Sequence, residues 1–176
     1  MCSSDLGSVQ ISSLCFSFAN IDSYDYINGP TLYVWKDEST PLYKAVRSGK
    51  YPLVDTHFCN NLVGPDVIQC NAGHMTVDTT DPWAISEAMI LGRQKAVQYL
   101  EAMKDVRPST FSNAFVVKTA SLLGVRDSRR IEGDYIFTVE DWRQRKSFED
   151  EIGRNCYYID VHSGKHKPEH YKKGES

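Results

Sequence analysis

One long amphipathic helix constrains the fold of this chain more than any other sequence feature. Asp81 is a natural N-cap, and Pro82 follows at the first helical position, where its missing N–H costs nothing. Pro108 stops the segment, so the sequence predicts a helix from Asp81 to about Lys104. Apolar and small residues recur at steps of three and four and form one stripe, Ile85, Met89, Gly92, Ala96, Tyr99 and Met103. A helix with such a stripe must bury it against another layer of structure.

Several short strands are predicted to form that layer. In the first of them, Leu14, Phe16 and Phe18 share one face and alternate with smaller residues, while Ile11 is out of phase, which indicates a bulge or a strand covered on both sides. The turn at 121–124 predicts that the strands on either side of it pair as neighbours. Strand patterns cover residues 10–19, 31–35, 67–77, 113–120, 126–138 and 157–161. We therefore predict an α+β fold, with a mostly antiparallel sheet and one long helix packed across it.

Two shorter helices complete the pattern. The first is predicted over residues 38–48 and ends at Gly49, a favoured residue after a helix C-terminus. The second is predicted over residues 140–145, where Thr138 and Asp141 resemble a capping box. A single helical turn is expected at 148–153, a loop at 20–30, and no clear period at 52–65.

The length of 176 residues fits one domain. Residues 1–8 are predicted to be a non-native or disordered start, residues 9–164 the domain, and residues 165–176 a polar, truncated tail. The start looks non-native and the polar far end stops without a closing element, which together indicate an internal fragment of a longer protein.

Charge and cysteine content exclude several classes of function. The net charge of −3 predicts no general attraction to nucleic acid or to an anionic membrane. No apolar run is long enough to cross a bilayer. The five cysteines are widely spaced and form no CxxC motif, so neither a zinc site nor an iron–sulfur site is expected within this chain. Free thiols in a reducing compartment, the cytoplasm, are the simplest interpretation.

A cluster of arginines is the first candidate site. Arg126, Arg129 and Arg130 fall within five residues, and guanidinium groups this close repel each other unless an anion lies opposite. On an extended strand Arg129 would share a face with Ile131 and point inward, where a charge must be paired. The anion is either a substrate or cofactor group or a carboxylate of this chain, for which Glu132, Asp134 and Asp160 are candidates.

Two histidines are further candidates. His74 lies at the end of a predicted strand and could transfer a proton near neutral pH, or it could be a surface or hydrogen-bonded structural residue. Asp160 and His162 lie two residues apart, so on a strand they face the same way and the carboxylate can orient the imidazole. Neither a G-x-G-x-x-G nor a G-x-x-x-x-G-K-[ST] motif occurs, so the chain carries no dinucleotide- or phosphate-binding fingerprint.

Several short motifs, taken together and in order, resemble a family of FAD-dependent oxidoreductases that is commonly grouped with the flavin subunit of heterodisulfide reductase. The motifs are NAGH at 71–74, DTTDPW at 78–83, GRQ at 92–94, LGVRDSRRI at 123–131, DEIGR at 150–154 and YIDVH at 158–162. The resemblance covers about residues 10–170. One departure is Asp127, where the family usually has Glu, and the shorter carboxylate weakens any bond to a neighbouring arginine.

The resemblance implies which domain of the enzyme this chain forms and which type of reaction the enzyme catalyses. The family's dinucleotide fingerprint lies upstream of this region, so the chain resembles the substrate-side (cap) domain of a two-domain flavoenzyme that lacks its FAD-binding domain. The implied reaction moves a hydride between a small-molecule substrate and FAD. The family grouping also brings a 4Fe–4S cluster, which the scattered cysteines of this chain do not support.

The same resemblance assigns roles to the candidate residues. His74 is the expected proton donor or acceptor, and Arg126 and Arg129 are expected to stabilise negative charge. The expected cofactor-binding residues are Arg130, Asp160 and His162.

A different hypothesis is a stand-alone α+β binding module that holds a small anion at its arginine cluster. It predicts a closed pocket near Arg126. If the chain is instead a fragment that lacks its FAD-binding domain, a large apolar patch is expected to lie exposed beside the arginines.

Overall fold

The computed structural model describes residues 10–33, 37–126, 128–129 and 132–154. In this part of the chain, strands and helices follow in the order β1 (Phe16–Ala19), α1 (Ser23–Asn28), α2 (Pro41–Arg47), β2 (Phe58–Gly64), β3 (Val67–Ala72), α3 (Pro82–Val106), α4 (Pro108–Phe111), β4 (Phe115–Thr119) and α5 (Val139–Gln144).

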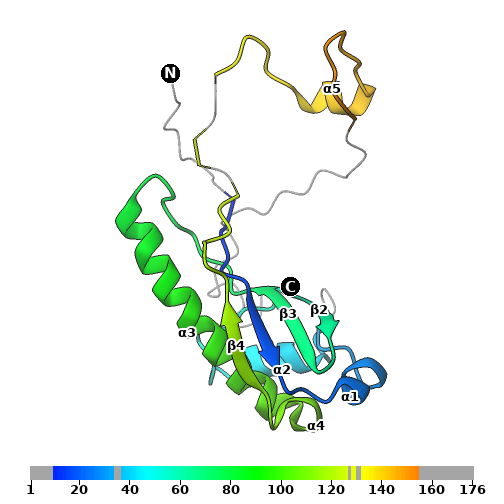
Figure 1. Ribbon diagram of the computed structural model, residues 1–176, viewed down its shortest axis with the longest axis vertical. Coiled ribbons are helices and arrows are strands. Elements are labelled where there is room, and N and C mark those ends of the chain that lie inside the picture. The colour runs from blue at the N-terminus through cyan, green and yellow to red at the C-terminus, as the bar shows by residue number, and fades with distance from the viewer. Residues whose placement is uncertain (1–9, 34–36, 127, 130–131, 155–176) are drawn as a thin grey trace.

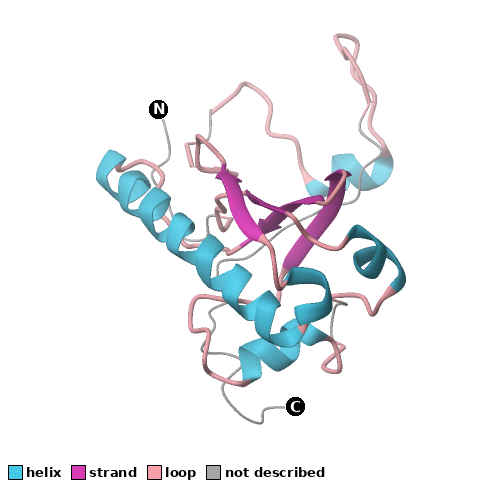
Figure 2. Cartoon of the chain, turned by 60° about the horizontal axis from the view of Figure 1, so that its bottom comes forward, coloured by secondary structure: helices cyan, strands magenta, loops and turns pink. Residues whose placement is uncertain are grey.

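Four strands form one antiparallel sheet in the order β2-β3-β1-β4. The hairpin of β2 and β3 supplies one half, and β1 joins it to β4. The long helix α3 runs beside this sheet, with α2 and α4 at its C-terminal end (Figure 1). Figure 2 shows the same helix passing diagonally beside the strands, with shorter helices gathered near its end. The predicted α+β fold, an antiparallel sheet with one long helix packed against it, is confirmed.

The core lies between the sheet and the helices. Phe16 and Phe18 of β1 point to this side, and their rings contact Tyr99 of α3 and Phe111 of α4 at centroid distances of 5.5 and 6.4 Å. Ser17 lies between them and lines an open cavity on the opposite side with Gln69 and Lys118. The predicted placement of Phe16 and Phe18 on one face is confirmed, and it directs both rings into the core, while all four residues of β1 are buried.

The predicted start and end of α3 are confirmed. The Asp81 carboxylate caps the helix by accepting a hydrogen bond from the Trp83 N–H at 2.9 Å, and Pro82 occupies the first turn. The helix ends at Val106, and the N–H of Arg107 still donates to the carbonyl of Met103. The apolar stripe faces the core, where Ala96, Tyr99, Ala102 and Met103 are fully buried.

Gly92 allows α3 to approach the N-terminal segment closely. A Cβ atom at this position would lie 2.6 Å from Cβ of Leu14, closer than two carbon atoms can pack. Gly92 is therefore a small residue at a site of tight helix packing. Leu14 belongs to a second apolar cluster at the N-terminal half of the helix, with Met75, Val77, Ala88 and Leu123.

We expect Gly92→Ala to destabilise the protein. Overpacking against Leu14 costs about 1–3 kcal/mol, and the better helix propensity of alanine returns up to about 1 kcal/mol. Urea unfolding measures the difference. Gln94→Ala, on the exposed side of the same helix, is the control and should change stability little. A Gly92→Ala protein as stable as the control would contradict the close contact.

The sequence prediction for residues 126–138 is wrong. The described residues of this segment form no strand, and β4 pairs with β1 instead. Gly124 makes one bridge to Ser13, after which the chain leaves the sheet (Figure 1). Without a neighbouring strand to accept its backbone hydrogen bonds, an apolar alternation alone does not make a strand. Arg129, predicted to point inward, is exposed.

The segment that leaves the sheet ends in a small cluster around α5, apart from the core (Figure 1). The predicted capping box is confirmed: Thr138 Oγ1 accepts from the Asp141 N–H, and the Asp141 carboxylate accepts from the Thr138 N–H at 2.8 Å. These bonds to Thr138 hold the pKa of Asp141 far below its usual value. The Lys146 ammonium lies over the Tyr135 ring, 4.5 Å from its centroid.

Other local predictions have mixed outcomes. The helix over 38–48 is confirmed as α2, and Gly49 after it has the expected positive φ of 69°. The loop at 20–30 instead contains α1, which Asp22 caps, and the stretch at 52–65 contains β2. Residues 31–33 form no strand, and the remainder of that predicted strand lies outside the described residues, as does the strand at 157–161.

Candidate active site

His74 lies directly after β3, where the chain turns toward the core. The turn depends on Gly73, which has a φ of 70°, a conformation that residues with a Cβ rarely adopt. A Cβ there would also lie 3.2 Å from Cδ of Lys95. After the turn, Met75 pairs with Ser12 in both directions at 2.8 Å, which fixes the chain on the far side of His74. The His74 side chain is 7% exposed.

The carboxylate of Asp55 holds His74 in place. Its Oδ2 accepts a hydrogen bond from the His74 backbone N–H at 3.0 Å and lies 3.7 Å from Nδ1 of the imidazole. Its Oδ1 accepts from the N–H of His57 at 2.8 Å. One half-buried carboxylate therefore joins the loop before β2 to the turn after β3.

Two residues of α3, Lys95 and Tyr99, complete the cluster. The Tyr99 hydroxyl accepts hydrogen bonds from the N–H groups of Asp55 and Gly73, at 3.0 and 3.3 Å, and can donate to the Asp55 carbonyl at 3.2 Å. The Lys95 ammonium donates to the Leu53 carbonyl at 2.9 Å. Because Lys95 and Tyr99 are one helical turn apart, they present both groups on the same face of the helix.

The charges of this cluster depend on one another. Burial opposes ionisation of Asp55, but the hydrogen bond and charge of His74, the His57 N–H and the charge of Lys95 outweigh it, so the pKa of Asp55 is lowered. Burial lowers the pKa of Lys95, and the charge of Asp55 partly offsets this effect. In Tyr99, whose charged form is an anion, burial raises the pKa. The site therefore holds an ionised carboxylate directly beside an imidazole, an arrangement suited to orienting a proton donor or acceptor.

We expect the Asp55 carboxylate to make stability depend on acid pH. Its pKa is lower in the folded protein than the ordinary value of 3.8, so it stabilises the fold above that value and loses this effect as the pH falls through the folded pKa. The difference in free energy of unfolding between the wild type and Asp55→Asn should therefore narrow between about pH 5 and pH 2. Urea unfolding over this range measures it. A difference that stays constant with pH would contradict the role given to the carboxylate.

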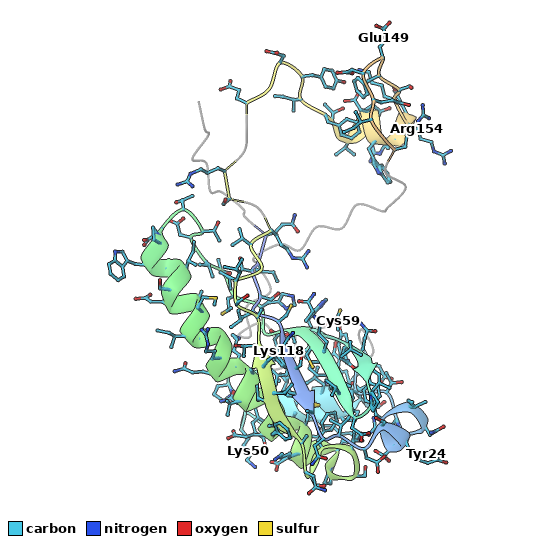
Figure 3. The ribbon with its side chains drawn as sticks, in the orientation of Figure 1. Tyr24, Lys50, Cys59, Lys118, Glu149 and Arg154 are labelled. Carbon is cyan, nitrogen blue, oxygen red and sulfur yellow. The ribbon has the colours of Figure 1, made fainter. Side chains whose placement is uncertain are left out.

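His57 and Cys59 extend the cluster to the protein surface. The rings of His57 and His74 meet edge to face, with centroids 4.5 Å apart. On its other side, Nε2 of His57 lies 3.5 Å from Sγ of Cys59, an exposed residue of β2. Figure 3 labels Cys59 at the end of the sheet where β2 and β3 lie together.

The arginines lie apart from this cluster on the segment that leaves the sheet. Arg126 and Arg129 are both exposed. The charge of Arg129 acts on Asp78, which lies before α3. Bonds from the Thr80 side chain and N–H lower the pKa of Asp78, and the charge of Arg129 lowers it further. Asp78 was not among the carboxylates that the sequence proposed. Arg130, Asp160 and His162 lie outside the described residues.

Sequence reasoning found His74 but missed the groups that surround it. Asp55, His57 and Cys59 are spaced two apart, a pattern that places side chains on one side of an extended chain. Lys95 interrupts the apolar face of α3 one turn before Tyr99, which was a second available signal. Because these residues meet through tertiary packing, neither signal alone identified the site.

Two other features are absent from the described residues. There, no three His, Cys, Asp or Glu side chains come together in an arrangement that could hold a metal ion. No helix in the same part of the chain combines the length and apolarity needed to cross a bilayer.

Comparison with protein-family models gives a match that covers almost the whole chain. The model of a protein family described as FAD dependent oxidoreductase matches residues 4–175. Comparisons with curated proteins and with solved structures gave no match.

Proposed function

The chain belongs to the FAD dependent oxidoreductase family, and from this premise we propose that it forms the substrate-side domain of a flavoenzyme. The proposed reaction transfers a hydride between a small-molecule substrate and FAD, with the flavin supplying the redox chemistry when bound. The observation that carries this proposal is the family match over residues 4–175. The proposed location of the enzyme is the cytoplasm.

The described residues do not fit the pyrophosphate group of FAD. A dinucleotide cradle consists of a strand, a glycine-rich turn and a helix N-terminus within a parallel sheet. The sheet here is antiparallel throughout, and the G-x-G-x-x-G motif is absent from the sequence. We therefore propose that another domain of the same protein, outside these 176 residues, binds most of the cofactor.

Exposed apolar side chains on both sides of the arginines support this domain contact. Leu122 is 79% exposed and Ile136 is 74% exposed, although both side chains are large and apolar. Tyr135, Phe137 and Val139 are also more than half exposed. A soluble domain rarely leaves so many such residues uncovered in one segment, so the segment is expected to pack against the cofactor domain.

In this proposal His74 moves the proton that accompanies the hydride. Asp55 orients its imidazole, since the carboxylate oxygen lies 3.7 Å from Nδ1. Gly73 and Tyr99 fix the position of the chain at this point. Asp55 is thus a positioning residue that acts through His74.

Arg126 and Arg129 are proposed to stabilise negative charge on the substrate or on the reduced flavin. Both guanidinium groups are exposed on the segment that is expected to meet the cofactor domain, so they remain available for an anion. Arg130, Asp160 and His162, outside the described residues, are proposed to contact the cofactor. The rival function, a stand-alone module that holds an anion in a closed pocket, finds less support because Arg126 is exposed.

Redox titration of the flavin in the complete enzyme tests the arginine role. Replacing Arg129 with methionine should lower the flavin midpoint potential by about 30–60 mV, the equivalent of one charged hydrogen bond to the reduced ring. Arg47→Met, on α2, is the control and should leave the potential unchanged. If Arg129→Met alters the melting temperature alone, Arg129 has a structural role, in a charge interaction such as that with Asp78.

A further inference from the structure

Cys59 differs from the other described cysteines in its surroundings. It lies on β2, at the edge of the sheet, and its side chain is exposed. Its Sγ atom is 3.5 Å from Nε2 of His57, within hydrogen-bond range for sulfur. Cys70 is fully buried, and burial raises the pKa of its thiol far above the ordinary value, so it is protonated and inaccessible.

The imidazole beside Cys59 is fixed by the cluster already described. The backbone N–H of His57 donates to Asp55 at 2.8 Å, and its ring meets the His74 ring edge to face. Tyr33 contacts the same ring at a centroid distance of 6.2 Å. An imidazole held on two sides loses little conformational freedom when it pairs with a thiol.

The charged groups near this pair come from three parts of the fold. Asp55, in the loop before β2, carries a negative charge at neutral pH. His74 lies after β3 and shares the Asp55 carboxylate. Lys95, on α3, donates to the Leu53 carbonyl, and its positive charge acts on Asp55.

We propose that Cys59 and His57 form a nucleophilic thiol–imidazole pair that exchanges with small disulfides. The Cys59 thiol gives its proton to Nε2 of His57, and the resulting thiolate sulfur attacks one sulfur of the disulfide. The S–S bond of the disulfide breaks as the new S–S bond to Cys59 forms. The departing thiolate takes up the proton. Cys59 is thereby oxidised to a mixed disulfide, and one half of the small disulfide is reduced to a thiol.

The proposed exchange uses other reacting groups than the proposed flavin chemistry. Asp55 bonds the backbone of both His57 and His74, but Cys59 and His57 have no part in the roles given to His74 and the arginines, and the exchange step needs no cofactor. A failure of the thiol experiment would therefore leave the flavoenzyme proposal untouched, and the reverse also holds.

The rate of exchange with glutathione disulfide tests the proposal on the 176-residue chain. The mixed disulfide at each cysteine is measured by peptide mass spectrometry between about pH 5.5 and pH 9, a range that spans the ordinary thiol pKa of about 8.5. At pH 6.5 Cys59 should react about 10-fold faster than an accessible thiol of ordinary pKa, such as that of reduced glutathione with the same disulfide. The pH at which its rate is half-maximal should lie below that of such a thiol.

Two variants test whether the His57 imidazole, and not only the exposure of Cys59, makes the thiol reactive. His57→Asn should slow the reaction of Cys59 about 10-fold at pH 6.5 and much less at pH 9, where an ordinary thiol is ionised without help. Cys59→Ser should remove the modified peptide and leave the other cysteines unchanged. A half-maximal rate near pH 8.5 in the wild type, or a His57→Asn rate equal to that of the wild type, would overturn the proposal. Should His57→Asn fail to fold, the wild-type pH profile decides alone.

Discussion

Replacing Tyr99 with alanine is expected to lower the free energy of unfolding by about 3–5 kcal/mol, the range for removing a large aromatic side chain from a core. Tyr99 is fully buried at the centre of the main core. Its ring stacks on Phe58 of β2 and contacts Phe16 of β1, each at a centroid distance of 5.5 Å. Its removal therefore opens a cavity between α3 and the sheet. Urea unfolding at pH 7 measures the loss.

Tyr99→Phe separates packing from hydrogen bonding. This variant keeps the ring but leaves the N–H groups of Asp55 and Gly73 without their acceptor, at a cost of about 1–3 kcal/mol. Hydrogen exchange should also become faster at these two amides. If Tyr99→Phe were as stable as the wild type, with unchanged exchange at both amides, the hydroxyl would not hold the two loops of the site together.

Replacing Arg107 with methionine is expected to cost about 3 kcal/mol, the lower end of the range for breaking a buried ion pair, since Asp25 keeps some contact with water. The Arg107 side chain is 4% exposed. Its guanidinium group donates to the carbonyls of Pro30 and Asp25 and to the Asp25 carboxylate. This one side chain therefore ties the segment around α1 to the junction between α3 and α4.

Lys104, a half-buried cation in the last turn of α3, offers a matched control for Arg107. Lys104→Met removes a positive charge close to Arg107 in sequence and should have a much smaller effect on unfolding. Thermal unfolding of both variants measures the contrast. Equal losses for the two would show that helix-end charge, and not the bonds to Pro30 and Asp25, accounts for the stability.

The sequence predicted those elements whose signals are local. Asp81, Pro82 and the apolar stripe defined α3, and Thr138 with Asp141 defined the start of α5, because capping and helix periodicity act over a few neighbouring residues. The alternation of Phe16 and Phe18 located β1 for the same reason.

The sequence did not predict elements that depend on distant partners. The alternation after Gly124 resembled a strand, but among the described residues it pairs with neither edge of the sheet, and most of the segment is exposed. β2 was missed because Asn60 and Asn61 interrupt its apolar pattern, although backbone pairing with β3 holds the strand in place. In both cases the tertiary context, and not the local pattern, decided the structure.

The candidate site was only partly predictable, for the same reason. His74 was identified from its place after a strand, and the structure adds Asp55, Lys95 and Tyr99, which lie near it through packing of α3 and the loop before β2. The roles of His74, Arg126 and Arg129 remain predictions. The family supports flavin chemistry for the chain but does not assign these residues.

Retention of FAD tests the central claim most directly. The 176-residue chain, and the same chain joined to the residues that its gene encodes on either side, are each mixed with FAD and desalted. We expect the extended protein to retain stoichiometric FAD with its visible absorbance. The chain alone should retain none, since its described residues form no pyrophosphate cradle and its sequence holds no G-x-G-x-x-G motif. Stoichiometric FAD on the chain alone, or none on the extended protein, would contradict the proposed division of the flavoenzyme.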